Sequence, residues 1–92
     1  MIIVNESDIT VSWFCYNQQD ALKWVALASG ELANTTGNNQ FTYNPPKNSN
    51  GLYFVRFTYK GGGTEIGGQI VATNQTITLH GSNDHYHTTV SG

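Results

Sequence analysis

Charged residues are scarce in this sequence: they make up 11% of the chain, against a usual share of about a quarter. Six acidic and four basic residues give a net charge of −2 at neutral pH, and the basic residues form no run. Binding to nucleic acid requires a concentrated basic surface. The composition therefore argues against a nucleic-acid partner, and Asn, Thr, Ser, Gln and Gly must keep the chain soluble.

Cysteine and long hydrophobic runs are also lacking. The one cysteine, Cys15, excludes an internal disulfide and a cysteine-based zinc site. No apolar run approaches the roughly 20 residues that a membrane-spanning helix needs. The apolar residues 1–4 are followed at once by the polar residues 5–8, so no signal-peptide pattern is present. We expect a cytoplasmic protein, or one released without a classical signal, with no transmembrane segment.

The clearest pattern in the sequence is the alternation within residues 52–60, which glycine bounds on both sides. Aromatic and β-branched side chains occupy every second position of this segment: Tyr53, Val55, Phe57 and Tyr59. In an extended chain these side chains share one face. A helix would scatter them around its circumference. The pattern therefore predicts the central strand of a β-rich domain.

Other short segments with strand composition recur about every ten residues. They lie at residues 2–4, 9–16, 40–43, 64–73 and 76–79, and the polar C-terminal segment 81–90 is a candidate edge strand. No repeat of fixed period is visible, which argues against a β-trefoil or a propeller. The expected fold is all-β: a single domain over residues 1–92, built as an antiparallel β-sandwich of seven or eight short strands. A domain of this size is marginally stable, so we also expect a homodimer or homotetramer.

Residues 17–30 leave two structures open. Asn17 and Gly30 suit the two ends of a helix, which would span about residues 18–29 and make the fold α+β. However, residues 22–27 are apolar on almost every side, and a strand over residues 22–32 is the interpretation that we favour.

Eight or so aromatic residues exceed what so small a core requires. Trp13, Tyr53 and Phe57 are assigned to the core because they lie on predicted buried faces. Three others lie beside polar loops and are candidates for stacking on a ligand: Tyr16, Trp24 and Tyr86.

The C-terminal segment supplies the polar candidates: Asn83, Asp84, His85 and His87. On a strand, His85 and His87 point the same way and, with His80 or Asp84, have the donor types of a metal site. Such spacings are common by chance, so we predict no metal. We favour recognition of a sugar or another polyol, which requires only fixed hydrogen-bonding groups.

Nothing in the sequence indicates catalysis. The acidic residues are dispersed, without the pairing that a glycosidase needs. Cys15 falls on an apolar face, which predicts a buried, inert thiol. The triple glycine at 61–63 lacks the following residues of a phosphate-binding loop and predicts a tight turn. We therefore expect a protein that is not an enzyme and that uses no cofactor.

Three segments resemble the small cytoplasmic lectins and defence proteins of mushroom fruit bodies: Trp13–Asn17, the stretch from Trp24 to Leu32, and Gly51–Thr58. The resemblance covers about half of the chain and is one of composition and style. It implies a non-catalytic fungal lectin that binds glycans with terminal sugars, galactosyl sugars among them, as a dimer or tetramer. The sequence lacks trefoil repeats and the galectin-type sugar-binding motif, so no family site maps onto it.

The leading hypothesis is thus a lectin with a shallow polar and aromatic site, formed by the residues Tyr16, Trp24, Asn83, Asp84, His85, Tyr86 and His87. One alternative is a membrane-active, pore-forming defence protein whose exposed aromatic residues contact lipid. Another is a protein-interaction or inhibitor module.

Overall fold

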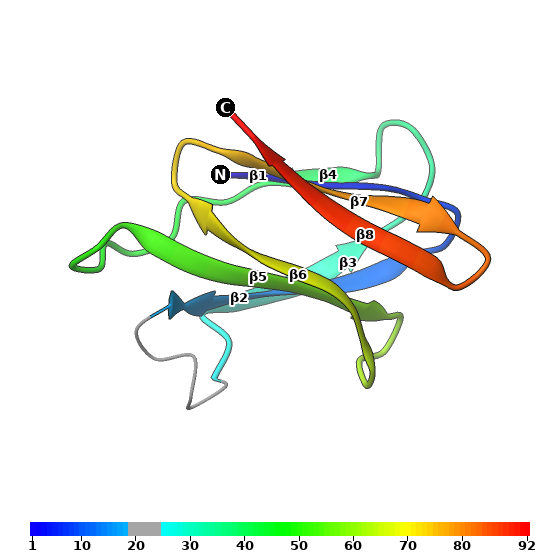
Figure 1. Ribbon diagram of the computed structural model, residues 1–92, viewed down its shortest axis with the longest axis horizontal. Helices are drawn as coiled ribbons and strands as arrows, with labels where there is room; N and C mark the ends of the chain where they lie inside the picture. Colours follow the sequence, from blue (N-terminus) through cyan, green and yellow to red (C-terminus); the bar gives the residue numbers. More distant parts are fainter. Residues whose placement is uncertain (19–24) are drawn as a thin grey trace.

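Alternating apolar and polar side chains build two four-stranded sheets that pack face to face (Figure 1). The structure is a computed structural model that describes residues 1–18 and 25–92. One sheet has the order β4-β1-β7-β8, with the strands Gln40–Thr42, Ile2–Ser7, Thr76–Ser82 and His85–Ser91. The other has the order β3-β2-β5-β6, with Ala28–Leu32, Val11–Asn17, Leu52–Tyr59 and Glu65–Ala72. The predicted all-β sandwich with eight strands is confirmed.

The expected central strand is β5, which lies between β2 and β6 within its sheet. Tyr53, Val55 and Phe57 are fully buried, as the alternation predicts. Tyr59 differs: it continues the alternation but lies at the end of the sandwich, where 37% of its surface is exposed. The sheet simply ends there, so a ring on the inner face reaches solvent.

The first strand, β1, is longer than residues 2–4, because the polar residues that follow also pair. β1 runs parallel to β7, whereas the other strand pairs are antiparallel. Asn5 is fully buried within β1. Its side-chain nitrogen donates to the carbonyl oxygens of Ile9, Leu32 and Ala33, and its side-chain oxygen accepts from Ser7. The polar residues therefore extend the strand instead of ending it.

The ambiguous segment forms a strand only in its last part. β3 begins at Ala28, and residues 25–27 before it are irregular. The α+β alternative is therefore wrong for the described part of residues 18–29, since Ala28 and Ser29 pair with β2. Residues 19–24 lie outside the described part of the chain.

The paired glycines of β6 serve a bulge and a close contact, as their position in a strand predicts. The pairing of β5 with β6 shifts register between Phe57 and Thr58, whose partners are Gly67 and Glu65. A methyl group at Gly68 would lie 2.7 Å from the Phe54 ring. The ring thus packs directly on this part of β6.

The core lies between the sheets and contains the inner side chains of both. Its fully buried residues include Ile3, Ile77 and Leu79 from one sheet and Val11, Cys15 and Val71 from the other, with Trp13 3% exposed. Burial raises the pKa of the Cys15 thiol to about 12. The prediction of a buried thiol is confirmed, and since the thiolate is the reactive form, the raised pKa is consistent with low reactivity.

Candidate functional site

A two-residue turn between β7 and β8 forms the centre of the candidate site. Ser82 pairs with His85, which leaves Asn83 and Asp84 as the two turn residues. Both have positive φ angles, 53° and 66°. A hairpin turn of this kind requires positive φ at both positions, which Asn and Asp tolerate better than most residues. The turn places the Asp84 carboxylate at the end of the sandwich, in solvent.

Asp8, from the connection between β1 and β2, docks against this turn. Its backbone N–H donates to the Gly81 carbonyl at 3.2 Å. One carboxylate oxygen, Oδ1, accepts from the Tyr86 hydroxyl at 2.8 Å. The other, Oδ2, accepts from the Asn83 backbone N–H at 3.2 Å. Both oxygens are therefore held in place by residues 75 or more positions away in the sequence.

Tyr59, at the end of β5, brings the second sheet into the same cluster. Its hydroxyl donates to Asp84 Oδ1 at 2.9 Å. Its ring meets the Tyr86 ring edge to face, with the centroids 6.3 Å apart and an interplanar angle of 84°. We name these five residues the turn cluster: Asp8, Tyr59, Asn83, Asp84 and Tyr86.

The hydrogen bonds of the turn cluster shift the pKa values of its members. The Tyr86 hydroxyl, with help from the Asn83 backbone N–H, lowers the pKa of Asp8. The same pairing raises the pKa of Tyr86, and the hydrogen bond to Asp84 raises the pKa of Tyr59. At neutral pH Asp8 is thus a carboxylate and both tyrosines keep their protons.

The turn cluster offers hydrogen-bond acceptors beside aromatic rings. An ionised carboxylate has about four acceptor positions. Among the described residues, Asp8 uses two of them and Asp84 uses one. The remaining positions suit hydroxyl donors, and the partly exposed Tyr59 ring is an apolar surface next to them. The turn cluster therefore combines fixed hydrogen-bond acceptors with an exposed aromatic ring.

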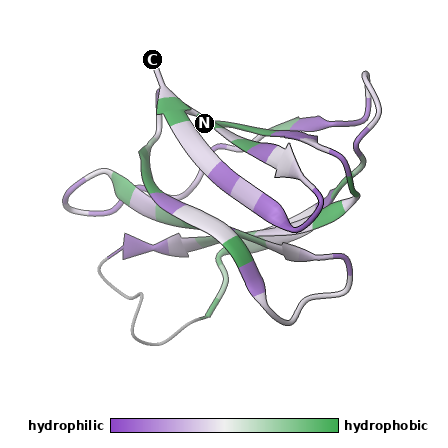
Figure 2. Ribbon diagram, turned by 45° about the vertical axis from the view of Figure 1, so that its right-hand side comes forward, coloured by the Kyte–Doolittle hydropathy of each residue, from purple (hydrophilic) through white to green (hydrophobic). Residues whose placement is uncertain are grey.

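The two predicted histidines of the site point away from the turn cluster. His85 and His87 flank Tyr86 on β8, so they lie on the opposite face of the strand. Hydrophilic residues at the start of this edge strand are visible in Figure 2. His87 stacks on His80, with centroids 5.1 Å apart.

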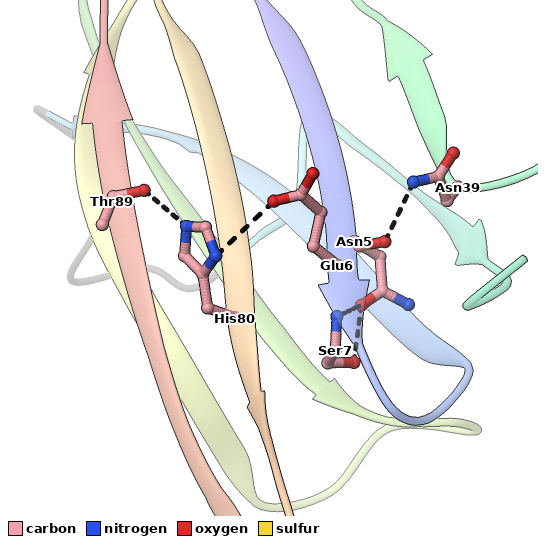
Figure 3. A network of polar contacts seen from close by, with 6 residues as sticks. All are labelled: Asn5, Glu6, Ser7, Asn39, His80 and Thr89. Atoms are coloured by element: carbon pink, nitrogen blue, oxygen red, sulfur yellow. Dashed lines mark hydrogen bonds and ion pairs between the residues drawn. The ribbon is translucent and has the colours of Figure 1, made fainter. Parts of the chain in front are cut away.

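His80 connects three strands on this outer face (Figure 3). Its Nε2 lies 2.8 Å from the Thr89 hydroxyl on β8, and its Nδ1 lies 3.6 Å from a Glu6 carboxylate oxygen on β1. Within residues 1–18 and 25–92, no group of three or more His, Cys, Asp or Glu side chains has the geometry of a metal site.

Tyr16 is not part of the turn cluster. It pairs with Phe54, five residues before Tyr59 along β5, which corresponds to roughly 16 Å. It is only 4% exposed, and its ring lies 6.3 Å from Phe54 and 5.9 Å from the Arg56 guanidinium. Such burial leaves little ring surface for a ligand. The remaining aromatic candidate, Trp24, lies outside the described residues.

The structure thus brings together Asn83, Asp84 and Tyr86 from the predicted set. It adds Asp8 and Tyr59, which no sequence pattern assigned to the site. The Asn-Asp pair between two strand-like segments is a signal for a two-residue turn. No local signal connects that turn to Asp8 or Tyr59, because the contacts depend on how the two sheets pack.

Comparisons with known proteins found no matching family model, no matching curated protein and no matching solved structure. The described chain contains no helix long and apolar enough to cross a membrane.

Proposed function

We propose that this protein is a non-catalytic lectin and that the turn cluster binds a terminal sugar of a glycan. The observation that carries the proposal is the pair of carboxylates, Asp8 and Asp84, held by tyrosine hydroxyls at an exposed end of the sandwich. Groups fixed before the ligand arrives lose little conformational freedom on binding. The resemblance to mushroom lectins, galactose binders among them, supports the same function.

The lowered pKa of Asp8 makes its side chain a hydrogen-bond acceptor and not a general acid. A glycosidase of the usual kind needs one carboxyl group whose pKa is raised, so that it can donate a proton. The pKa of Asp8 is lowered instead, and its carboxylate is an acceptor at neutral pH. Such a group accepts hydrogen bonds from hydroxyl groups but does not donate a proton.

Binding at one shallow site is expected to be weak, so the proposal includes a homodimer or homotetramer that presents several sites at once. Sedimentation equilibrium at micromolar protein tests this part of the proposal. A strictly monomeric protein would contradict it.

The first test is a glycan array probed with the folded protein, followed by titration of the best sugar. Asp84→Asn keeps the size of the side chain and its tolerance of positive φ, but replaces a carboxylate acceptor with an amide. A charge-assisted hydrogen bond contributes about 1.5–3 kcal/mol, so we expect affinity to fall about tenfold or more. Glu31→Gln, which removes the same charge from the exposed edge strand β3, is the matched control.

Equal affinities of Asp84→Asn and Glu31→Gln for the sugar would show that the turn cluster is not the binding site. A blank array from folded protein would reject the lectin. Leakage of lipid vesicles would then favour a membrane-active defence protein, and its absence a protein-interaction module.

A further inference from the structure

We propose a second binding site, at the opposite end of the sandwich from the turn cluster, for a carboxylate-bearing monosaccharide. The site is a pocket of about 380 Å³ lined by Asn44, Pro45, Lys47, Asn48, Tyr53 and Thr73. In Figure 1 the loop between β4 and β5, which carries four of these residues, lies at the far end of β5 from the turn between β7 and β8. The proposal does not depend on sugar binding at the turn cluster.

The pocket exists because the chain crosses here from one sheet to the other. Proline has no backbone N–H to pair, so Pro45 and Pro46 end the strand pairing of β4. Tyr53, fully buried at the start of β5, forms part of the wall, and its hydroxyl donates to the Pro46 carbonyl. The crossing loop is therefore fixed to the core.

Asn48 shapes the rest of the loop. Its side-chain oxygen accepts from the Gly51 N–H, and its side-chain nitrogen donates to the Leu52 carbonyl and to Asn17 Oδ1 at 2.7 and 2.8 Å. Gly51 has a φ of +68°, which permits the tight return into β5. Asn50 adds bonds to Gln18 and to the Leu52 N–H. This network fixes the conformation of the loop that lines the pocket.

Three polar side chains of the lining take no part in this network. Asn44, Lys47 and Thr73 form no hydrogen bond or ion pair within the described part of the chain. They offer an amide, an ammonium group and a hydroxyl at one opening. The Asn48 side chain, by contrast, already forms hydrogen bonds that hold the loop. The free groups are the ones that a ligand would meet.

Charge and size define the ligand class. Lys47 is the one charged residue of the lining, and no acidic residue lines the pocket. The pocket therefore favours a single negative charge. Its volume is near the lower end of the range for small-molecule sites, about 300–1,000 Å³. Asn44 and Thr73 match hydroxyl groups, and Pro45 supplies apolar surface. An acidic monosaccharide combines these features.

Glucuronate and glucose test the proposal, because they share a ring and differ by the carboxylate. We expect glucuronate to shift the amide resonances of residues 44–51 and 73 in ¹⁵N-correlated NMR spectra at millimolar concentration, while glucose acts at least fivefold more weakly. Lys47→Met should abolish the preference, and Lys60→Met, at the other end of β5, should preserve it. The preference should also weaken with salt.

Three results would overturn the proposal: no shifts with glucuronate, glucuronate shifts that persist unchanged in Lys47→Met, or equal shifts with acetate, which would indicate an anion site without sugar recognition. Asp84→Asn provides the separation from the turn cluster. This variant should bind glucuronate at the pocket normally, whether or not the protein proves to be a lectin.

Discussion

At the scale of single residues, the contact between Asp8 and Tyr86 determines the acid chemistry of the candidate site. The Tyr86 hydroxyl is the largest cause of the lowered pKa of Asp8, ahead of the Asn83 backbone N–H. A carboxyl group whose pKa is lower in the folded state contributes stability above its unfolded value. For Asp8 that ordinary value is 3.8, so its contribution is present at neutral pH and is lost as the pH falls through the lowered pKa.

Tyr86→Phe should therefore flatten the loss of stability in acid. The substitution removes the hydroxyl, so the pKa of Asp8 rises toward 3.8 and less stability depends on its charge. Urea unfolding between about pH 2 and 7, with a carboxyl NMR titration of Asp8, measures both effects. Tyr43→Phe is the control, since Tyr43 packs on Trp13 and not on the turn cluster. Parallel stability curves for Tyr86→Phe and the wild type would contradict the assignment.

At the scale of elements, the hairpin of β7 and β8 depends on Gly81. This residue pairs with Tyr86 and has a φ of +121°. A methyl group there would lie 2.0 Å from the His85 carbonyl oxygen. Since that oxygen is backbone of the paired strand, a rotamer change cannot relieve the clash. The turn that presents Asp84 rests on this close approach.

Gly81→Ala should cost about 3 kcal/mol or more, from the backbone strain and the clash together. For a domain of this size that corresponds to a fall of at least about 12 °C in melting temperature. Gly63→Ala is the matched control: its φ is +98°, but nothing lies within 4 Å of the added methyl. We expect about 1 kcal/mol there, from the backbone strain alone. Equal melting temperatures for the two variants would show that the close approach is unimportant.

At the scale of the whole molecule, Asn5 joins the two sheets. It belongs to β1 of one sheet, and its side-chain nitrogen donates to Leu32 at the end of β3, in the other, and to the adjoining Ala33. The Asn5 side chain also forms hydrogen bonds with Ser7 and Ile9, so both its oxygen and its nitrogen have partners. A fully buried amide with partners on both sheets fixes how they align.

Asn5→Leu should destabilise the protein by about 3–5 kcal/mol, because several buried backbone groups and the Ser7 hydroxyl lose their partner at about 1–3 kcal/mol each. Urea unfolding measures the change. Asn34→Leu, which removes one exposed bond to the Asp8 carbonyl, should cost less than about 1 kcal/mol. Similar unfolding midpoints for the two variants would contradict a sheet-joining role for Asn5.

Local features of this protein follow from its sequence alone. Alternation is a property of neighbouring residues, so it identified β5, the buried faces of Tyr53, Val55 and Phe57, and the buried position of Cys15. Turn chemistry is equally local, and it predicted the turn at the triple glycine. The turn at Asn83 and Asp84 was not predicted, because these residues were included in one candidate edge strand over residues 81–90.

The contacts between distant groups follow from the strand order and from the packing of the sheets. The parallel pairing of β1 with β7 brings Asp8 beside Gly81, and the packing of two sheets brings Tyr59 to Asp84. These contacts depend on strand order, which alternation leaves open because many orders bury the same faces. The burial of Tyr16 and the pocket beside Lys47 follow from that order as well.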